Sequence, residues 1–147
     1  MNLIEHKKAH LNFELIKEFE AGIELLGHEV KTLRSRHGKI EGAHVIVRGG
    51  EAFLVGASLP PYQQTNTPGD YDPDRTRRLL LTKQELAELA EYEQQKGLTI
   101  IPISVYNKGA KLKVRIAVAR GRKKFDKRAV LKERDVKREI DRTLKNQ

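Results

Sequence analysis

The 147-residue sequence predicts a mainly β protein with two helices, folded as one small antiparallel domain and followed by a basic C-terminal tail. Three observations support this prediction. Apolar and polar residues alternate through several segments, as they do in half-buried strands. Turns that contain glycine separate these segments at short intervals. The chain has a formal charge of +9, and residues 120–147, with 12 basic and 5 acidic residues, contribute +7 of it.

The first predicted strand covers residues 13–26. Its apolar residues occupy alternate positions and would face the core, whereas glutamates occupy positions on the other side. A bulge or bend at Gly22 would let so long a strand curl, as a small barrel requires. Residues 28–38 then predict a short helix that ends at Gly38, because glycine readily adopts the left-handed conformation found after helices.

The rest of the predicted domain is a strand hairpin, a proline-rich loop, a helix and a second hairpin, which cover residues 43–59, 60–78, 82–96 and 98–119 in that order. Thr82 and Glu85 match the capping box that begins a helix, and Gly97 follows as its stop. This order of strands and helices predicts a small barrel of the OB type, closed or partly open, over residues 1–120. An open α+β sandwich is the alternative.

Composition and motifs exclude several classes of protein. Without cysteine, the chain has no disulfide framework, thiol nucleophile or thiolate-ligated metal. It also lacks the glycine-rich nucleotide loops, the serine motif of hydrolases, a secretion signal and any apolar run of about 18 residues. His6 and His10 have helical spacing, but we expect them to be solvent-exposed. We therefore expect no enzyme activity, cofactor, metal site or membrane contact, and a cytoplasmic location.

Clustered basic residues favour a nucleic-acid partner, because phosphates attract them. Lys111, Lys113 and Arg115 share the outer face of one predicted strand, where they form either a phosphate-binding row or a solvated surface. Lys31 and Arg34 lie on the outer face of the short helix. The aromatic residues left for base stacking are Tyr62, Tyr71, Tyr106 and Phe125. This scarcity favours recognition of a folded RNA by shape and phosphate over nonspecific binding of single strands.

Residues 121–147 form the predicted tail. It has few apolar residues for its length, so we expect it to be mobile alone and ordered on a partner. As a helix over residues 129–145, it would carry Arg134, Arg138 and Arg142 as one stripe. Such a helix is about 25 Å long, enough to follow a groove lined with phosphates. A solvated charged helix without a role is the alternative.

Four stretches of the sequence together carry a resemblance. They are FEAGIELLGHEVKTLR at 19–34, GEAFLVGASLPPY at 50–62, DPDRTRRLLLTKQEL at 72–86 and RGRKKFDKRAVLKERDVKRE at 120–139. In this order they resemble the SsrA-binding protein family, small protein B. The resemblance implies a non-enzymatic OB-type barrel that binds the tRNA-like domain of transfer-messenger RNA and carries it to stalled ribosomes. It also implies that elongation factor Tu and alanyl-tRNA synthetase take part indirectly.

The resemblance also implies roles for individual residues. Glu20, Leu80 and Lys113 match family positions implicated in RNA binding, although spacing alone favours a structural role for Glu20. The tail would fold as a helix on the ribosome, at the decoding centre and in the empty mRNA channel. The tail residues expected to bind there are Gly121, Arg122, Lys123, Lys124, Phe125, Asp126, Lys127, Arg128, Arg134 and Arg138. A general OB-fold protein that binds single-stranded RNA is the alternative function.

Overall fold

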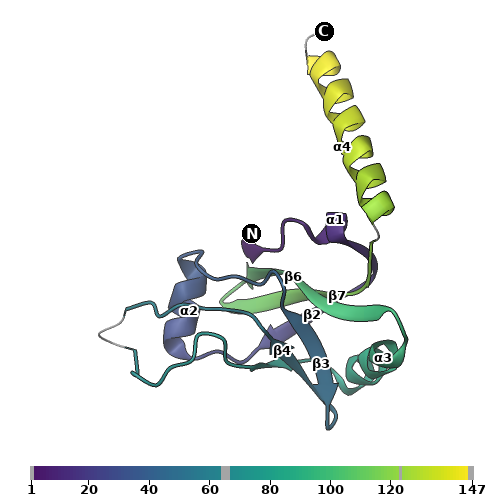
Figure 1. Cartoon of the computed structure of the whole chain (residues 1–147). Coiled ribbons are helices and arrows are strands. Elements are labelled where there is room, and N and C mark those ends of the chain that lie inside the picture. Colours follow the sequence, from purple (N-terminus) through teal and green to yellow (C-terminus); the bar gives the residue numbers. More distant parts are fainter. Residues whose placement is uncertain (1, 64–66, 123, 146–147) are drawn as a thin grey trace.

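The computed structural model of the chain describes residues 2–63, 67–122 and 124–145 (Figure 1). The described residues form one antiparallel sheet of seven strands in the order β1-β6-β7-β2-β5-β4-β3. The strands are β1 (Asn2–Glu5), β2 (Phe13–Ile23), β3 (His44–Arg48), β4 (Glu51–Val55), β5 (Arg77–Leu80), β6 (Leu98–Lys108) and β7 (Lys111–Gly121). The helices are α1 (Ala9–Asn12), α2 (Gly27–Arg34), α3 (Lys83–Gln94) and α4 (Lys124–Lys145).

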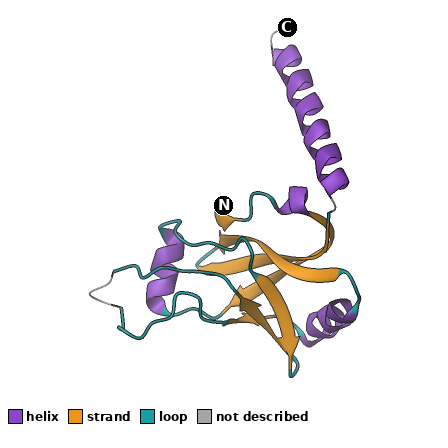
Figure 2. Ribbon diagram, in the orientation of Figure 1, coloured by secondary structure: helices purple, strands orange, loops and turns teal. Residues whose placement is uncertain are grey.

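Strand β7 is central to the sheet, because it pairs with β2 on one side and β6 on the other. Its alternate residues Val114, Ile116 and Val118 are buried in the main core, as their spacing predicts. Ala119 is also buried, in a second and smaller cluster with Ala9 of α1. Figure 2 shows α2 and α3 at opposite sides of the sheet, while α4 points away from it. The mainly antiparallel β architecture is therefore confirmed.

One detail of the predicted fold is wrong, and a second, the OB-type barrel, is not confirmed. The described residues form four helices instead of two, since the four-residue α1 and the 22-residue α4 are additional. The sheet is also not closed into a barrel, because no hydrogen-bonded ladder joins the edge strands β1 and β3 within the described ranges. Strand β3 instead packs near β6, so the sheet curls without closing. Closure needs edge strands that overlap along their length, and these two have only four and five residues.

The first predicted strand is also corrected in the structure. Strand β2 ends at Ile23, three residues before the predicted end. Its irregularity lies between Leu15 and Lys17 instead of at Gly22. Gly22 pairs with Lys113 of β7 and also with Leu80 of β5, so here β2 has a neighbour on each side. The glycine is needed for close packing, because an added Cβ would come within 3.1 Å of the Leu80 Cβ.

A buried ion cluster secures the proline-rich segment that the sequence predicts as a loop. The side chains of Glu29 in α2 and Arg77 in β5 are both 0% exposed, and Arg77 Nη2 lies 2.7 Å from Glu29 Oε2. Arg75 also pairs with Glu29, and the Tyr71 hydroxyl donates to Glu29 Oε2 at 2.9 Å. Burial acts to raise the pKa of Glu29, but hydrogen bonds from Arg75, the Leu26 amide and Arg77 outweigh it and lower that pKa to about 2. The cluster joins α2, β5 and the segment between β4 and β5.

The predicted tail forms helix α4, which begins earlier than the predicted residue 129 and projects from the body (Figure 1). Its first turns lie near α1. Lys123 and the side chains of Lys124, Phe125 and Asp126 lie outside the described residues. The mobility expected of the tail without a partner stays a prediction. None of the described helices is long and apolar enough to cross a membrane.

Candidate nucleic-acid interface

The predicted basic row lies on β7, where its position is set by the two neighbouring strands. Lys111 and Arg115 are exposed and Lys113 is half-buried. Arg115 pairs in register with Glu20 of β2, and Lys113 with Tyr106 of β6. The sheet therefore brings a carboxylate and a phenol, which are distant in sequence, beside the three cations.

Glu20 is held in place by two residues of β6. The Tyr106 hydroxyl donates to Glu20 Oε2 at 2.5 Å, and Lys108 Nζ lies 2.8 Å from Glu20 Oε1. The Arg115 guanidinium lies over the Tyr106 ring, 5.3 Å from its centroid. Hydrogen bonds from Lys108 and Tyr106 lower the pKa of Glu20, and the nearby charge of Lys113 adds to this effect. The carboxylate is therefore ionised and oriented at neutral pH.

Tyr106 plays a different part from the base stacking considered from its sequence. Its side chain is buried, and its hydroxyl is directed to Glu20. Burial and the hydrogen bond to Glu20 raise the pKa of Tyr106 to about 12, so the phenol stays protonated and remains a donor. Tyr71 is likewise engaged in the Glu29 cluster. Tyr62 is exposed, and the Phe125 side chain lies outside the described residues.

A pocket of about 350 Å³ adjoins the basic row where β2 ends and β7 begins. Arg34, Leu80, Lys111 and Lys113 line it, with Gly22 between them. Leu80 is 46% exposed, so its apolar side chain is available to a partner. The end of α2 reaches this place because Arg34 Nη2 donates to the Ala110 carbonyl at 3.1 Å.

The structure thus brings most of the predicted RNA-binding residues to one surface, which we call the basic face. It consists of Glu20, Arg34, Leu80, Tyr106, Lys108, Lys111, Lys113 and Arg115. Lys31 is exposed on α2 but does not line the pocket. Sequence reasoning missed Lys108 and the anchoring role of Tyr106, because only strand pairing places them beside Glu20. Contact of these residues with RNA stays a prediction.

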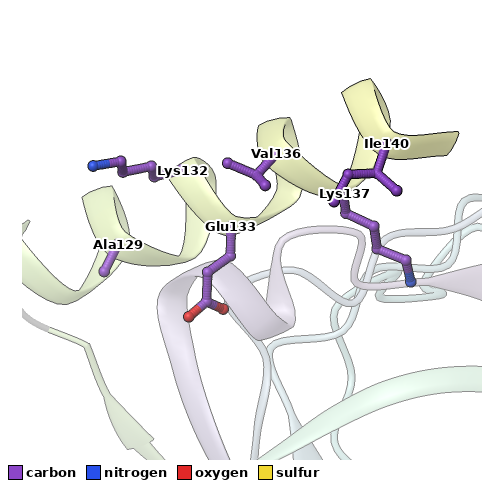
Figure 3. Close-up of a pocket in the computed structure, with 6 residues that line it drawn as sticks. All are labelled: Ala129, Lys132, Glu133, Val136, Lys137 and Ile140. Carbon is purple, nitrogen blue, oxygen red and sulfur yellow. The ribbon is translucent and has the colours of Figure 1, made fainter. Parts of the chain in front are cut away.

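The predicted tail residues divide between the junction and α4. Arg122 is engaged with the body, since its amide donates to the Asn12 carbonyl at 2.8 Å and its Nε to the His10 carbonyl at 2.9 Å. Arg134 and Arg138 follow one turn apart along α4. A neighbouring face of α4 forms a shallow apolar pocket of about 470 Å³ (Figure 3), lined by Ala129, Lys132, Glu133, Val136, Lys137 and Ile140.

A metal site does not form in the described part of the chain, where no three His, Cys, Asp or Glu residues gather in suitable positions. His10 is exposed as predicted, but His6 is only 8% exposed, so the expectation for His6 is wrong. The N-terminal segment adds β1 to the sheet and carries His6 with it. The His6 ring then packs edge-on against Phe13, with the ring centroids 6.2 Å apart.

Comparison with known proteins gives a consistent result. Residues 3–146 match the family described as SmpB protein. A relative from Enterococcus hirae, named SsrA-binding protein, is 42% identical over 144 residues, which cover 98% of this chain and 93% of the relative. A relative of the same name from Microcystis aeruginosa is 39% identical over 143 residues, with 97% and 93% covered.

A solved structure is also similar. Its description is "tmRNA-SmpB: a journey to the center of the bacterial ribosome", and one of its chains is 37% identical to this one with a TM-score of 0.68. The match covers 82% of this chain and 84% of that chain. The sequence matches cover nearly the full length and the structural match covers most of the chain, and this chain belongs to the SmpB protein family.

Proposed function

We propose that this protein binds the tRNA-like domain of transfer-messenger RNA, the SsrA RNA, and delivers it to stalled ribosomes in trans-translation. The observation that carries this proposal is the match of residues 3–146 to the SmpB family, whose relatives are named SsrA-binding protein. The RNA and the ribosome are the direct partners. Elongation factor Tu and alanyl-tRNA synthetase take part indirectly. The protein acts as a binding partner in the cytoplasm and catalyses no reaction itself.

The basic face is the proposed contact with the tRNA-like domain. Lys111, Lys113 and Arg115 supply positive charge to phosphates, and Leu80 offers an apolar contact to a sugar or base. Glu20 repels phosphate, so its part is to accept hydrogen bonds from a ribose 2′-hydroxyl or a base N–H. A carboxylate held at a fixed place among cations favours one register of a folded RNA over others.

The curled sheet serves this role in the manner of an OB-type barrel, although its edges are not joined. In OB folds the strand face and adjoining loops bind nucleic acids. The basic face has the same composition, since it joins strands β2, β6 and β7 to the end of α2 and to Leu80 of β5. We therefore assign residues 1–120 to the RNA-binding body.

Residues 121–147 are the proposed ribosome-binding tail, placed at the decoding centre and along the mRNA channel. Helix α4 has 22 residues and is about 33 Å long. Its basic residues suit a passage lined with phosphates, which an intact message would otherwise occupy. Competition between message and helix for this passage would direct the protein to ribosomes that lack a message.

A competition experiment tests the RNA-binding function. The tRNA-like domain and an unstructured RNA of equal length and charge compete for the full-length protein in an equilibrium gel-shift assay. We expect the folded RNA to bind at least tenfold more tightly, because shape and phosphate placement carry the recognition. Equal affinities would support the alternative function, a general binder of single-stranded RNA.

A further inference from the structure

Two opposite charges of the basic face are neighbours that do not pair with each other. Glu20 of β2 and Arg115 of β7 are directly opposite in the strand register, where an acid and a base attract each other across strands. Both side chains lie in the described part of the chain, yet no ion pair joins them, and the Glu20 carboxylate pairs with Lys108 instead. Each of the two side chains contacts Tyr106, which keeps them apart.

Tyr106 holds the two charges with different parts of its side chain. Its hydroxyl donates to Glu20 Oε2 at 2.5 Å, and its ring faces the Arg115 guanidinium, 5.3 Å from the centroid. Lys108 Nζ takes the other carboxylate oxygen. Tyr106 is only 8% exposed, so packing fixes its ring and little of it is open to a ligand. The result is a hydrogen-bond acceptor and a guanidinium held side by side.

Both charges keep hydrogen-bonding capacity for a ligand. An ionised carboxylate has about four lone-pair sites, and Tyr106 and Lys108 occupy one on each oxygen of Glu20. A guanidinium has several N–H donors, more than contact with one phenol can use. The side chain of Glu20 is 38% exposed and Arg115 is exposed. A ligand can therefore reach both groups at once.

An acceptor beside a cation matches the backbone of RNA. The ribose 2′-hydroxyl is a donor, and the phosphate that follows it in the chain is an anion. The cations around Glu20 attract phosphates, so sugar hydroxyls are the donors that come nearest to the carboxylate. A base N–H does not bring an anion to Arg115 with it. A DNA backbone supplies the phosphate but lacks the hydroxyl.

We propose that Tyr106 determines specificity for RNA over DNA, because it holds Glu20 to accept from a ribose 2′-hydroxyl and Arg115 to bind the adjacent phosphate. Tyr106 is a positioning residue, since it acts through these two side chains and is itself buried. The inference rests on the proposed function and deepens it, because it names the chemical group that this part of the basic face recognises.

A scan of single 2′-deoxy substitutions in the tRNA-like domain is the first test. Each RNA carries one deoxyribose, and filter binding measures its affinity for the full-length protein. We expect one or two positions to lower the affinity at least fivefold. If the protein does not bind the unmodified domain, the proposed function fails. If it binds the unmodified domain and every substituted domain equally, the proposed function stands and this inference fails.

Tyr106→Phe connects the phenol hydroxyl to the sensitive position. The variant keeps the buried ring, and we expect it to bind the unmodified domain at least threefold more weakly. Deoxyribose at the sensitive position should then cost less than a further twofold. Independent defects in the protein and the RNA would instead give losses that multiply, which would contradict the proposal. Tyr92→Phe on α3 is the matched control, because it removes a tyrosine hydroxyl outside the basic face and should keep the wild-type pattern.

The positioning step is also tested without RNA, by NMR titration of the Glu20 carboxyl carbon. Hydrogen bonds from Lys108 and Tyr106 of β6 lower the pKa of Glu20, Lys113 of β7 adds to this effect, and Arg115 is the cross-strand neighbour. We expect this pKa to be higher in Tyr106→Phe than in the wild type. An unchanged pKa would show that the hydroxyl does not hold the carboxylate, and would overturn the inference whether or not the RNA binds.

Glu20→Ala keeps the proposal testable if Tyr106→Phe fails to fold. The Glu20 side chain is exposed, so its removal leaves the core intact. Low salt keeps binding measurable, because phosphate contacts strengthen there. We expect the variant to bind the unmodified and the 2′-deoxy domain equally, since the acceptor is absent. A fivefold loss that persists in Glu20→Ala would place the 2′-hydroxyl at another residue, and the proposal would fail.

Discussion

Glu29 is fully buried and ionised because Arg75 and Arg77 surround its carboxylate. Folding lowers the pKa of Glu29 from 4.5 to about 2, so the ion cluster stabilises the fold above pH 4.5. The stabilisation is on the order of 3 kcal/mol and is lost as the pH falls from about 4.5 towards 2. As the pH falls, Glu29 is protonated at a higher pH in the unfolded protein than in the folded one. Acid therefore lowers the free energy of unfolding.

We predict that Glu29→Gln lowers the free energy of unfolding by about 3–5 kcal/mol at pH 7, because Arg77 then remains buried without its counter-charge. Urea denaturation of both proteins between pH 7 and pH 2.5 checks this prediction. The difference between them should shrink below pH 4.5, where protonation of Glu29 weakens the wild-type cluster. A difference that stays constant down to pH 2.5 would show that the carboxylate charge does not stabilise the fold.

Lys113 lies where the basic row meets the pocket that Arg34 and Leu80 line. We predict that Lys113→Ala weakens binding of the tRNA-like domain about tenfold and lowers the dependence of log affinity on log salt by about one unit. Filter binding at several salt concentrations measures both. Lys83→Ala on α3 removes the same charge away from the basic face, and its affinity should match wild type within about twofold. Equal losses in both variants would indicate attraction by net charge alone.

Single residues of the basic face differ in how far the sequence predicts them. The alternation along β7 places Lys111, Lys113 and Arg115 on one face, because this pattern depends only on neighbours in sequence. The bonds from Tyr106 and Lys108 to Glu20 span 86 and 88 residues, so they depend on strand register. Local patterns do not contain that register. The buried environment of His6 is missed for the same reason, since it follows from pairing of β1 with β6.

At the scale of elements, the sequence predicts the longer helices and strands but does not predict the shortest strands. The capping box of α3 is present, with the Thr82 side chain accepting from the Glu85 amide. Strands β1 and β5 have only four residues each, too few for a recognisable alternation. They form because longer strands offer them partners. A small β element of this kind is a consequence of tertiary structure.

Substitution of Gly22 tests how closely strands β2 and β5 pack. A side chain there meets the Leu80 Cβ, so we predict that Gly22→Val lowers the free energy of unfolding by about 1–3 kcal/mol and displaces β5 from β2. Because Leu80 lines the basic face, affinity for the tRNA-like domain should also fall. Gly27→Ala is the control, since no described heavy atom lies within 4 Å of its added Cβ. Thermal unfolding and gel shift measure the two effects, and equal stability of both variants would contradict close packing at Gly22.

At the scale of the whole molecule, charge separates a nearly neutral body from a cationic arm. Local charge counts predict this division, whereas closure of the sheet depends on how the edge strands meet, and local patterns do not decide between a closed and a partly open sheet. The separation has a mechanical counterpart, because α4 projects from the body and its contacts with the body include α1, next to the Arg122 hydrogen bonds (Figure 1). We therefore expect each part to bind its own RNA surface without distorting the other.

This separation predicts that the two activities can be divided by truncation. A chain that ends at Arg122 keeps the pairing of Gly121 with Phe13 and the contacts of Arg122 with α1, so the body stays intact. We expect it to bind the tRNA-like domain within about threefold of the full-length protein, because the basic face lies at the other end of the β2–β7 ladder. In a reconstituted translation system with a message that lacks a stop codon, it should tag no stalled chains.

The Lys113→Ala variant, tested in the same reconstituted system, weakens the basic face and keeps the tail. Its tail is complete, so raising the concentration of transfer-messenger RNA should restore tagging, whereas no concentration should restore tagging by the truncated chain. The contrast follows from mass action, because a weakened contact can be saturated and an absent one cannot. Loss of RNA binding on truncation, or tagging by the truncated chain at high RNA concentration, would show that body and tail act as one surface.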